Sequence, residues 1–339
     1  MVFGELVIAY LFLAGVGAGG TAAASLADLL MVREPFGVGV MTDFAEKCPA
    51  ERLTTLTLAV SCVAMALGTA CLALDLGRLD RMLSLFLALP TTLMNVGAWA
   101  VALLLAALIV LVLVRVLHLP WVGRHAVALL EAVASVLAAV VAVYVGLLLG
   151  TLTGVRLWSC VWVPVLFVLS AASCGCALLM AGSLFVEGDG VVARLVSWAA
   201  RVDAVVIAVE ALAAALFLAF VLGSEHPGVR TSAASLMTGE AVLPWWIGFV
   251  VCGVAAPLVI ETVCFVRDRW AVGATAYPAV AIALAGALVL VGAVGMRDAV
   301  VDAGAQRDLE LQDPAITPAE EDGKVQKAAS LPAASADVA

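Results

Sequence analysis

Eight long apolar runs dominate this sequence and determine its fold class. Each run is long enough to cross the hydrocarbon core of a membrane, which takes about 20 helical residues. The runs are continuously apolar, without the period-two alternation of a transmembrane β-barrel. The sequence therefore predicts an all-α integral membrane protein, a bundle of about eight transmembrane helices. The expected spans are approximately 5–32, 53–74, 92–117, 126–150, 158–185, 202–222, 242–266 and 274–296.

The composition supports this fold class. Hydrophobic residues make up 65% of the chain and charged residues 13%, against roughly 45–50% and about 25% in soluble domains. Lipid must therefore solvate much of the apolar surface. No basic stripe is present to neutralise phosphates, which argues against nucleic-acid binding. We expect residues 1–303 to form the membrane domain and 304–339, rich in Ala, Pro and charge, to be a disordered acidic tail.

Positive charges in the connections predict the orientation, because Lys and Arg favour cytoplasmic loops. The connections after the odd-numbered runs carry nine: Arg33, Lys47, Arg52, Arg115, Arg124, Arg194, Arg201, Arg267 and Arg269. The connections after the even-numbered runs carry four: Arg78, Arg81, Arg156 and Arg230. Counting Arg297 and Arg307 with the tail reduces the difference to nine against six. We expect a multi-pass protein of the cell membrane with both termini outside.

Two features resemble cofactor motifs but favour simpler interpretations. Residues 15–20 match G-x-G-x-x-G, but no strand precedes them and they lie within an apolar run, so we reject a dinucleotide site. Small residues spaced like Gly15 and Gly19 allow close helix packing, and they could equally make room for a flat ligand. His118 and His125 lie in a different connection from His226, on the other side, which argues against a bis-histidine haem. We expect no haem or metal in this chain.

Four acidic residues lie within the apolar runs, where charge is costly and often functional. They are candidates for a proton path: Glu131, Asp203, Glu210 and Glu261. Asp203 and Glu210 are two turns apart and share one face of a helix. The alternative is that these are interfacial acids or acids paired with arginine.

Another set of polar residues lies toward the other side of the membrane. The first run begins there and the fourth ends there, so Tyr10 and Tyr144 are expected at similar depth. A quinone needs an apolar cleft with one or two hydrogen-bond donors, and tyrosine hydroxyls suit that role. The alternative is an aromatic belt at the headgroup level, where we also place Trp121, Trp245 and Trp246. The candidate quinone-binding residues are Tyr10, Gly15, Asp75, Arg78, Tyr144 and Trp158.

Four stretches, in order along the chain, resemble the NrfD/PsrC family of polysulfide-reductase-like membrane subunits. AYLFLAGVGAGG at 9–20 resembles the opening span of that family. LDLGR at 74–78 followed by MNVGAW at 94–99 is similar to its LDLGR…MSWGSW stretch. YVGLLL at 144–149, LW at 157–158 and PVLFVLS at 164–170 follow its tyrosine signature. VLVG at 289–292, then MR at 296–297 and AG at 303–304, resemble its last helix.

The resemblance implies a membrane anchor of a respiratory oxidoreductase, as in anaerobic respiration. Such an anchor binds menaquinone or ubiquinone as substrate and exchanges electrons with a ferredoxin-like iron–sulfur subunit, often paired with a molybdopterin catalytic subunit. Tyr144 matches the family's quinone-site tyrosine, and Tyr10 stands where some members carry histidine. Gly150 departs from the serine that usually ends the tyrosine motif, and residues 91–99 lack the usual serines and the first Trp of that stretch.

Two other functions remain open from the sequence. A small-solute transporter would often show internal repeats and polar groups at the membrane midplane. We find no convincing repeat, and the polar groups gather near the surfaces. A structural anchor without its own quinone site is the other alternative.

Overall fold

The computed structural model describes ten stretches of the chain, and the account below concerns these residues. They are 5–32, 49–76, 93–117, 123–151, 155, 157–186, 190–224, 226–239, 241–270 and 279–305. Arg78, Trp121 and the predicted tail from residue 306 onward lie outside them. Almost all the described residues are helical and none forms a strand, and eight helices are long and apolar enough to cross a membrane. The predicted all-α membrane bundle is therefore confirmed.

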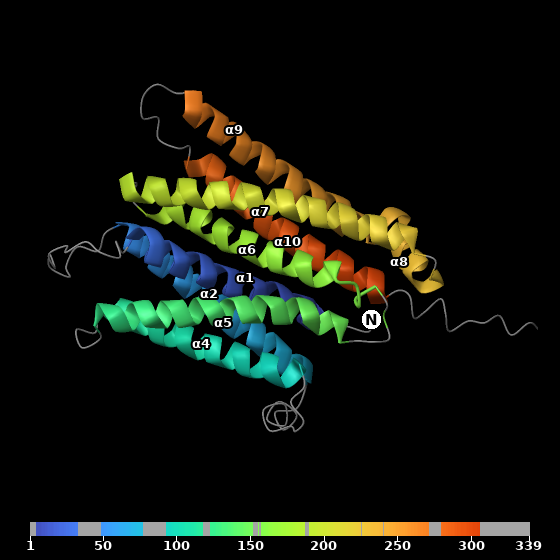
Figure 1. The fold of residues 1–339 in the computed structure, drawn as a ribbon, viewed down its shortest axis with the longest axis horizontal. Helices are drawn as coiled ribbons and strands as arrows, with labels where there is room; N and C mark the ends of the chain where they lie inside the picture. The colour runs from blue at the N-terminus through green and yellow to red at the C-terminus, as the bar shows by residue number, and fades with distance from the viewer. Residues whose placement is uncertain are drawn as a thin grey trace, which may run out of the picture.

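The helices fall into two groups that lie side by side (Figure 1). The first group consists of α1 (Glu5–Ala27) with its π-helical end η1 (Asp28–Val32), α2 (Pro49–Leu76), α4 (Leu93–Leu117) and α5 (Arg124–Gly150). The second group consists of α6 (Trp162–Gly182) with the 3₁₀ turn η2 (Ser183–Phe185), α7 (Gly190–Gly223), the short α8 (Pro227–Thr238), the π-helix η3 (Leu243–Ala255) continuing into α9 (Ala256–Trp270), and α10 (Ala279–Ala305).

Several helices are longer than the apolar runs that predicted them. α7 begins at Gly190 rather than near 202, and α10 continues to Ala305, past 296. Hydropathy marks only the stretch that lies in hydrocarbon, whereas the hydrogen-bonded helix can extend further at either end. The short helix α8 was not anticipated by the hydropathy pattern.

Close packing between α1 and α6 joins the two groups. A Cβ atom added to Gly19 of α1 would overlap the backbone of Ala171 on α6, and one added to Gly175 would overlap the backbone of Gly19. Lipid tails are as apolar as the side chains, so helix association in membranes depends on such close van der Waals contact between small residues. The glycine-rich stretch of α1 is thus part of a helix–helix contact.

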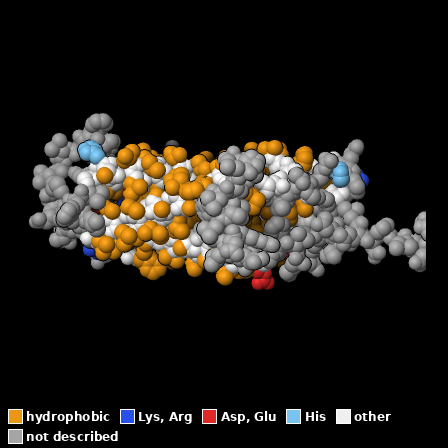
Figure 2. All heavy atoms as spheres, turned by 90° about the horizontal axis from the view of Figure 1, so that it is seen from below, with side chains coloured by type: hydrophobic (Ala, Val, Ile, Leu, Met, Phe, Trp, Pro, Cys, Tyr) orange, Lys and Arg blue, Asp and Glu red, His pale blue; other side chains and the backbone are white. Residues whose placement is uncertain are grey.

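The alternating helix directions define two faces of the bundle. We call the face where α1, α4 and α6 begin and where α2, α5, α7 and α10 end the amino-terminal face; it lies on the right in Figure 1. The other is called the opposite face. Figure 2 shows hydrophobic side chains along the flank of the molecule, with the visible His and Lys or Arg side chains near its two ends.

One aromatic prediction is wrong. Trp245 does not lie in an exposed belt: it is 1% exposed and packs between Phe217 and Phe249, with ring centroids 5.7 and 5.1 Å away. Trp246, the next residue, points outward and is exposed. Neighbouring residues of a helix face different directions, and only one of the two could reach the packed interior.

Candidate functional site

Two tyrosines from helices that are distant in the sequence meet near the amino-terminal face. Tyr10 of α1 is completely buried and Tyr144 of α5 nearly so. Their hydroxyl groups are neighbours, yet the Tyr10 hydroxyl makes no well-formed hydrogen bond to any residue that the structure describes. The Tyr144 ring lies against Gly97 of α4, where an added Cβ would overlap the ring. Three helices therefore build a pair of buried phenols.

The other predicted quinone-site residues have different surroundings. The Trp158 indole N–H donates a hydrogen bond to the Val300 carbonyl at 2.9 Å, and its ring packs against Gly304. Asp75 is exposed near the end of α2. Gly15 faces the guanidinium of Arg297 rather than an open cleft. Of the described candidates, the structure thus brings Tyr10 and Tyr144 into direct proximity.

Arg297 is the charged residue that the sequence interpretation misplaced. It was counted with the tail, but it is 0% exposed and lies within α10. Its Nε donates to the Leu11 carbonyl at 3.1 Å, and its Nη1 donates to Ser170 Oγ at 3.1 Å and to the Ala293 carbonyl at 2.8 Å. The sequence signal for this position was an arginine directly after an apolar run. The predicted span ended at residue 296, one residue before Arg297.

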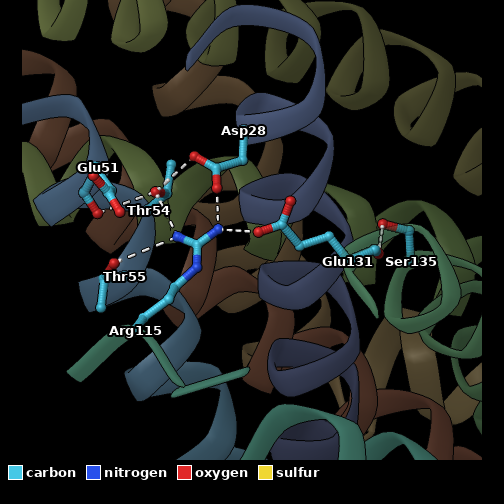
Figure 3. A network of polar contacts seen from close by, with 7 residues as sticks. All are labelled: Asp28, Glu51, Thr54, Thr55, Arg115, Glu131 and Ser135. Carbon is cyan, nitrogen blue, oxygen red and sulfur yellow. Dashed lines mark hydrogen bonds and ion pairs between the residues drawn. The ribbon is translucent and has the colours of Figure 1, made fainter. Parts of the chain in front are cut away.

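The four acids predicted as one proton path separate into two places. Glu131 lies in the first helix group, where Arg115 contacts both Glu131 and Asp28 (Figure 3). The same guanidinium donates from Nη1 to the hydroxyls of Thr54, at 3.1 Å, and Thr55, at 3.4 Å. All five side chains are buried. Glu131 is therefore an arginine-paired acid, as the alternative interpretation allowed.

This network, which we call the Arg115 cluster, connects four helical segments near the opposite face. Asp28 begins the π-helical η1 and accepts a hydrogen bond from the Thr54 hydroxyl of α2 at 3.0 Å. Arg115 comes from the last turn of α4 and Glu131 from the second turn of α5. The orientation count treated Arg115 as a free loop charge, but it is a buried member of this cluster.

The remaining three acids lie together in the second helix group. Asp203 and Glu210 of α7 and Glu261 of α9 are all buried. Ser173 of α6 donates to Asp203 Oδ1 at 2.6 Å, and the Glu261 carboxyl lies beside that of Asp203. Glu210 lies near enough to both Asp203 and Arg297 to be influenced by their charges. We call these three residues the acid row.

The described residues contain no group of three His, Cys, Asp or Glu side chains arranged to hold a metal ion. The arrangement instead combines buried phenols, carboxyls and arginines within an apolar bundle. Such groups can donate hydrogen bonds to a ligand or carry protons.

Comparison with known families agrees with this architecture. A family model described as polysulphide reductase, NrfD, matches residues 1–307. The chain belongs to the NrfD family. No curated protein matches it. As an NrfD protein it is a multi-pass membrane subunit of the kind found in oxidoreductase complexes, and the resemblance noted from the sequence motifs is confirmed.

Proposed function

We propose that this NrfD subunit binds membrane quinone at the Tyr10–Tyr144 pair. It exchanges electrons between the quinone pool, menaquinone or ubiquinone, and a ferredoxin-like iron–sulfur subunit docked at the amino-terminal face. A molybdopterin subunit would complete the enzyme. The observation that carries the proposal is the buried Tyr10 hydroxyl, which has no well-formed hydrogen bond to a described residue and lies next to a second phenol.

The two phenols supply the chemistry that a quinone substrate requires. A quinone presents carbonyl oxygens that accept hydrogen bonds, and negative charge develops on them as electrons arrive. A preorganised donor in an apolar site stabilises that charge more strongly than water does. Tyr144 donates to one such oxygen, and its ring is held against Gly97. Tyr10 donates a second hydrogen bond to the quinone or holds the Tyr144 hydroxyl in position.

The acid row is the proposed proton path. Quinone reduction takes up protons and quinol oxidation releases them, so a quinone-linked subunit handles protons as well as electrons. Asp203, Glu210 and Glu261 provide neighbouring carboxyls within the bundle, and Ser173 holds one of them in place. Glu131 is assigned instead to the Arg115 cluster, because it contacts Arg115 and lies in the other helix group.

The predicted orientation is still favoured when the buried Arg115 and Arg297 are left out of the loop counts. The connections after the odd-numbered runs then carry eight Lys and Arg residues, and those after the even-numbered runs, with Arg307 of the tail, carry five. The excess of Lys and Arg still favours the opposite face as cytoplasmic. The amino-terminal face and both termini would then lie outside the cell membrane.

The test is quinol oxidation by the complex purified from native membranes. Tyr144→Phe removes only a hydroxyl, and losing a hydrogen bond of about 1.5 kcal/mol should lower turnover about tenfold. Tyr277→Phe, a change to the third tyrosine of the chain, is the matched control and should retain wild-type turnover. The preparation should contain iron and acid-labile sulfide from the partner.

Three outcomes would count against the proposal. Wild-type turnover in both Tyr144→Phe and Tyr10→Phe would remove the quinone site from this pair. Normal assembly with the partner but no quinol reaction would indicate a structural anchor. Isolation without any iron–sulfur partner, together with solute uptake by vesicles, would favour a transporter.

A further inference from the structure

Arg297 lies between the two acids of α7 in depth. Its guanidinium donates to Ser170 of α6, whereas Asp203 accepts from Ser173 of the same helix, about 4–5 Å further from the amino-terminal face. Glu210 lies about 10 Å from Asp203 toward the amino-terminal face along α7, so it is on the amino-terminal side of the guanidinium. Tyr10 is on that side too, because Arg297 Nε donates to the carbonyl of Leu11, the next residue along α1.

Within the described residues no carboxylate forms a salt bridge with Arg297. Its guanidinium lies over the rings of Phe12 and Phe167, 5.9 and 5.2 Å from their centroids. Its Nη2 makes no hydrogen bond to a described residue and points at Gly15. Carbonyls, a serine hydroxyl and aromatic faces stabilise the charge but leave it positive. Glu210 is the acid that approaches it from α7.

A fixed positive charge at this depth has a direct consequence for proton movement. A guanidinium has no acceptor site and keeps its proton, so it cannot pass a proton on. Its field also repels an approaching proton strongly where the surroundings are apolar. Arginines exclude protons and cations from other membrane pathways in the same way.

We propose that Arg297 is an electrostatic barrier that divides the acid row between Asp203 and Glu210. Protons reach Asp203 from the opposite face, by way of Glu261, and stop there in the resting protein. Without the barrier they would continue to Glu210 and the tyrosine pair and dissipate the proton gradient across the membrane. This deepens the proton-path part of the proposed function, but it does not require quinone to bind at the tyrosines.

The test is passive proton entry into liposomes containing the purified complex, with a pH-sensitive dye inside, a potassium diffusion potential and no quinol. Arg297→Gln should raise the proton flux about tenfold or more, because the repulsion is removed. Arg297→Lys keeps a positive charge, but a buried lysine can release its proton, so its flux should lie between those of the wild type and Arg297→Gln. Adding Asp203→Asn to Arg297→Gln should restore low flux by interrupting the row.

The result that overturns the proposal is wild-type flux in Arg297→Gln, or a raised flux that Asp203→Asn does not lower. Quinol turnover is measured separately with Tyr144→Phe, so failure of the quinone site would leave this result unaffected.

Gly15→Ala is a less disruptive variant for use if the Arg297→Gln complex does not assemble. A Cβ on Gly15 would lie 2.5 Å from Arg297 Nη2, so Gly15→Ala should displace the flexible end of that side chain and raise the flux. Gly223→Ala is the matched control, because among the described residues nothing outside its own stretch of helix lies within 4 Å of its added Cβ. An unchanged flux in Gly15→Ala, when Arg297→Gln cannot be assembled, would also overturn the proposal.

Discussion

Replacing Arg115 by methionine should destabilise the first helix group strongly. The substitution keeps much of the side-chain volume but removes contacts to Asp28, Glu131, Thr54 and Thr55. It leaves two buried carboxyls without their shared guanidinium. Removing one member of a buried ion pair costs about 3–5 kcal/mol, because the remaining charge is no longer compensated. We expect a loss of that size in the free energy of unfolding.

Two further variants separate this charge effect from local disturbance. In Glu131→Gln the amide oxygen still accepts from Arg115 and Asp28 still pairs with it, so the cost should be about 1 kcal/mol. Ser135→Ala removes a hydroxyl that, within the described residues, donates to the Glu131 carbonyl of its own helix, and should cost at most about 0.5 kcal/mol. The assay is denaturant unfolding of the detergent-solubilised protein, followed by circular dichroism. An Arg115→Met protein as stable as Ser135→Ala would refute the reasoning.

Two more predictions concern helix packing and orientation. Gly19→Leu should separate α1 from α6, because even a Cβ at Gly19 overlaps the Ala171 backbone. The measurement is the yield of folded protein by size-exclusion chromatography, with Gly123→Leu as a control at a position with open space. Equal yields of the two variants would contradict the packing argument. A cysteine placed at Ala339 should react with a membrane-impermeant maleimide in intact cells if the termini lie outside, whereas labelling only after the cells are opened would reverse the orientation.

The sequence by itself determined the membrane class, the number of spans and the depth of many residues. Twenty or more apolar residues can satisfy their backbone polar groups in lipid only as a helix. Successive helices then alternate in direction, because each span crosses the membrane once. That is why Tyr10, near the start of one span, and Tyr144, near the end of another, could be expected at the same level. It is also why Asp203 and Glu210 could be assigned to one helix face.

Only the tertiary structure decided which residues at one depth are neighbours. Glu131 and Asp203 lie toward the same face, yet one contacts Arg115 and the other Ser173, because they belong to different helix groups. Arg297 was excluded by one residue from its predicted span, but α10 carries it into contact with α1 and α6. Hydropathy places groups along the membrane normal. Their lateral arrangement depends on contacts such as Gly19 with Ala171, where small residues allow two particular helices to approach, and no single span encodes its partner.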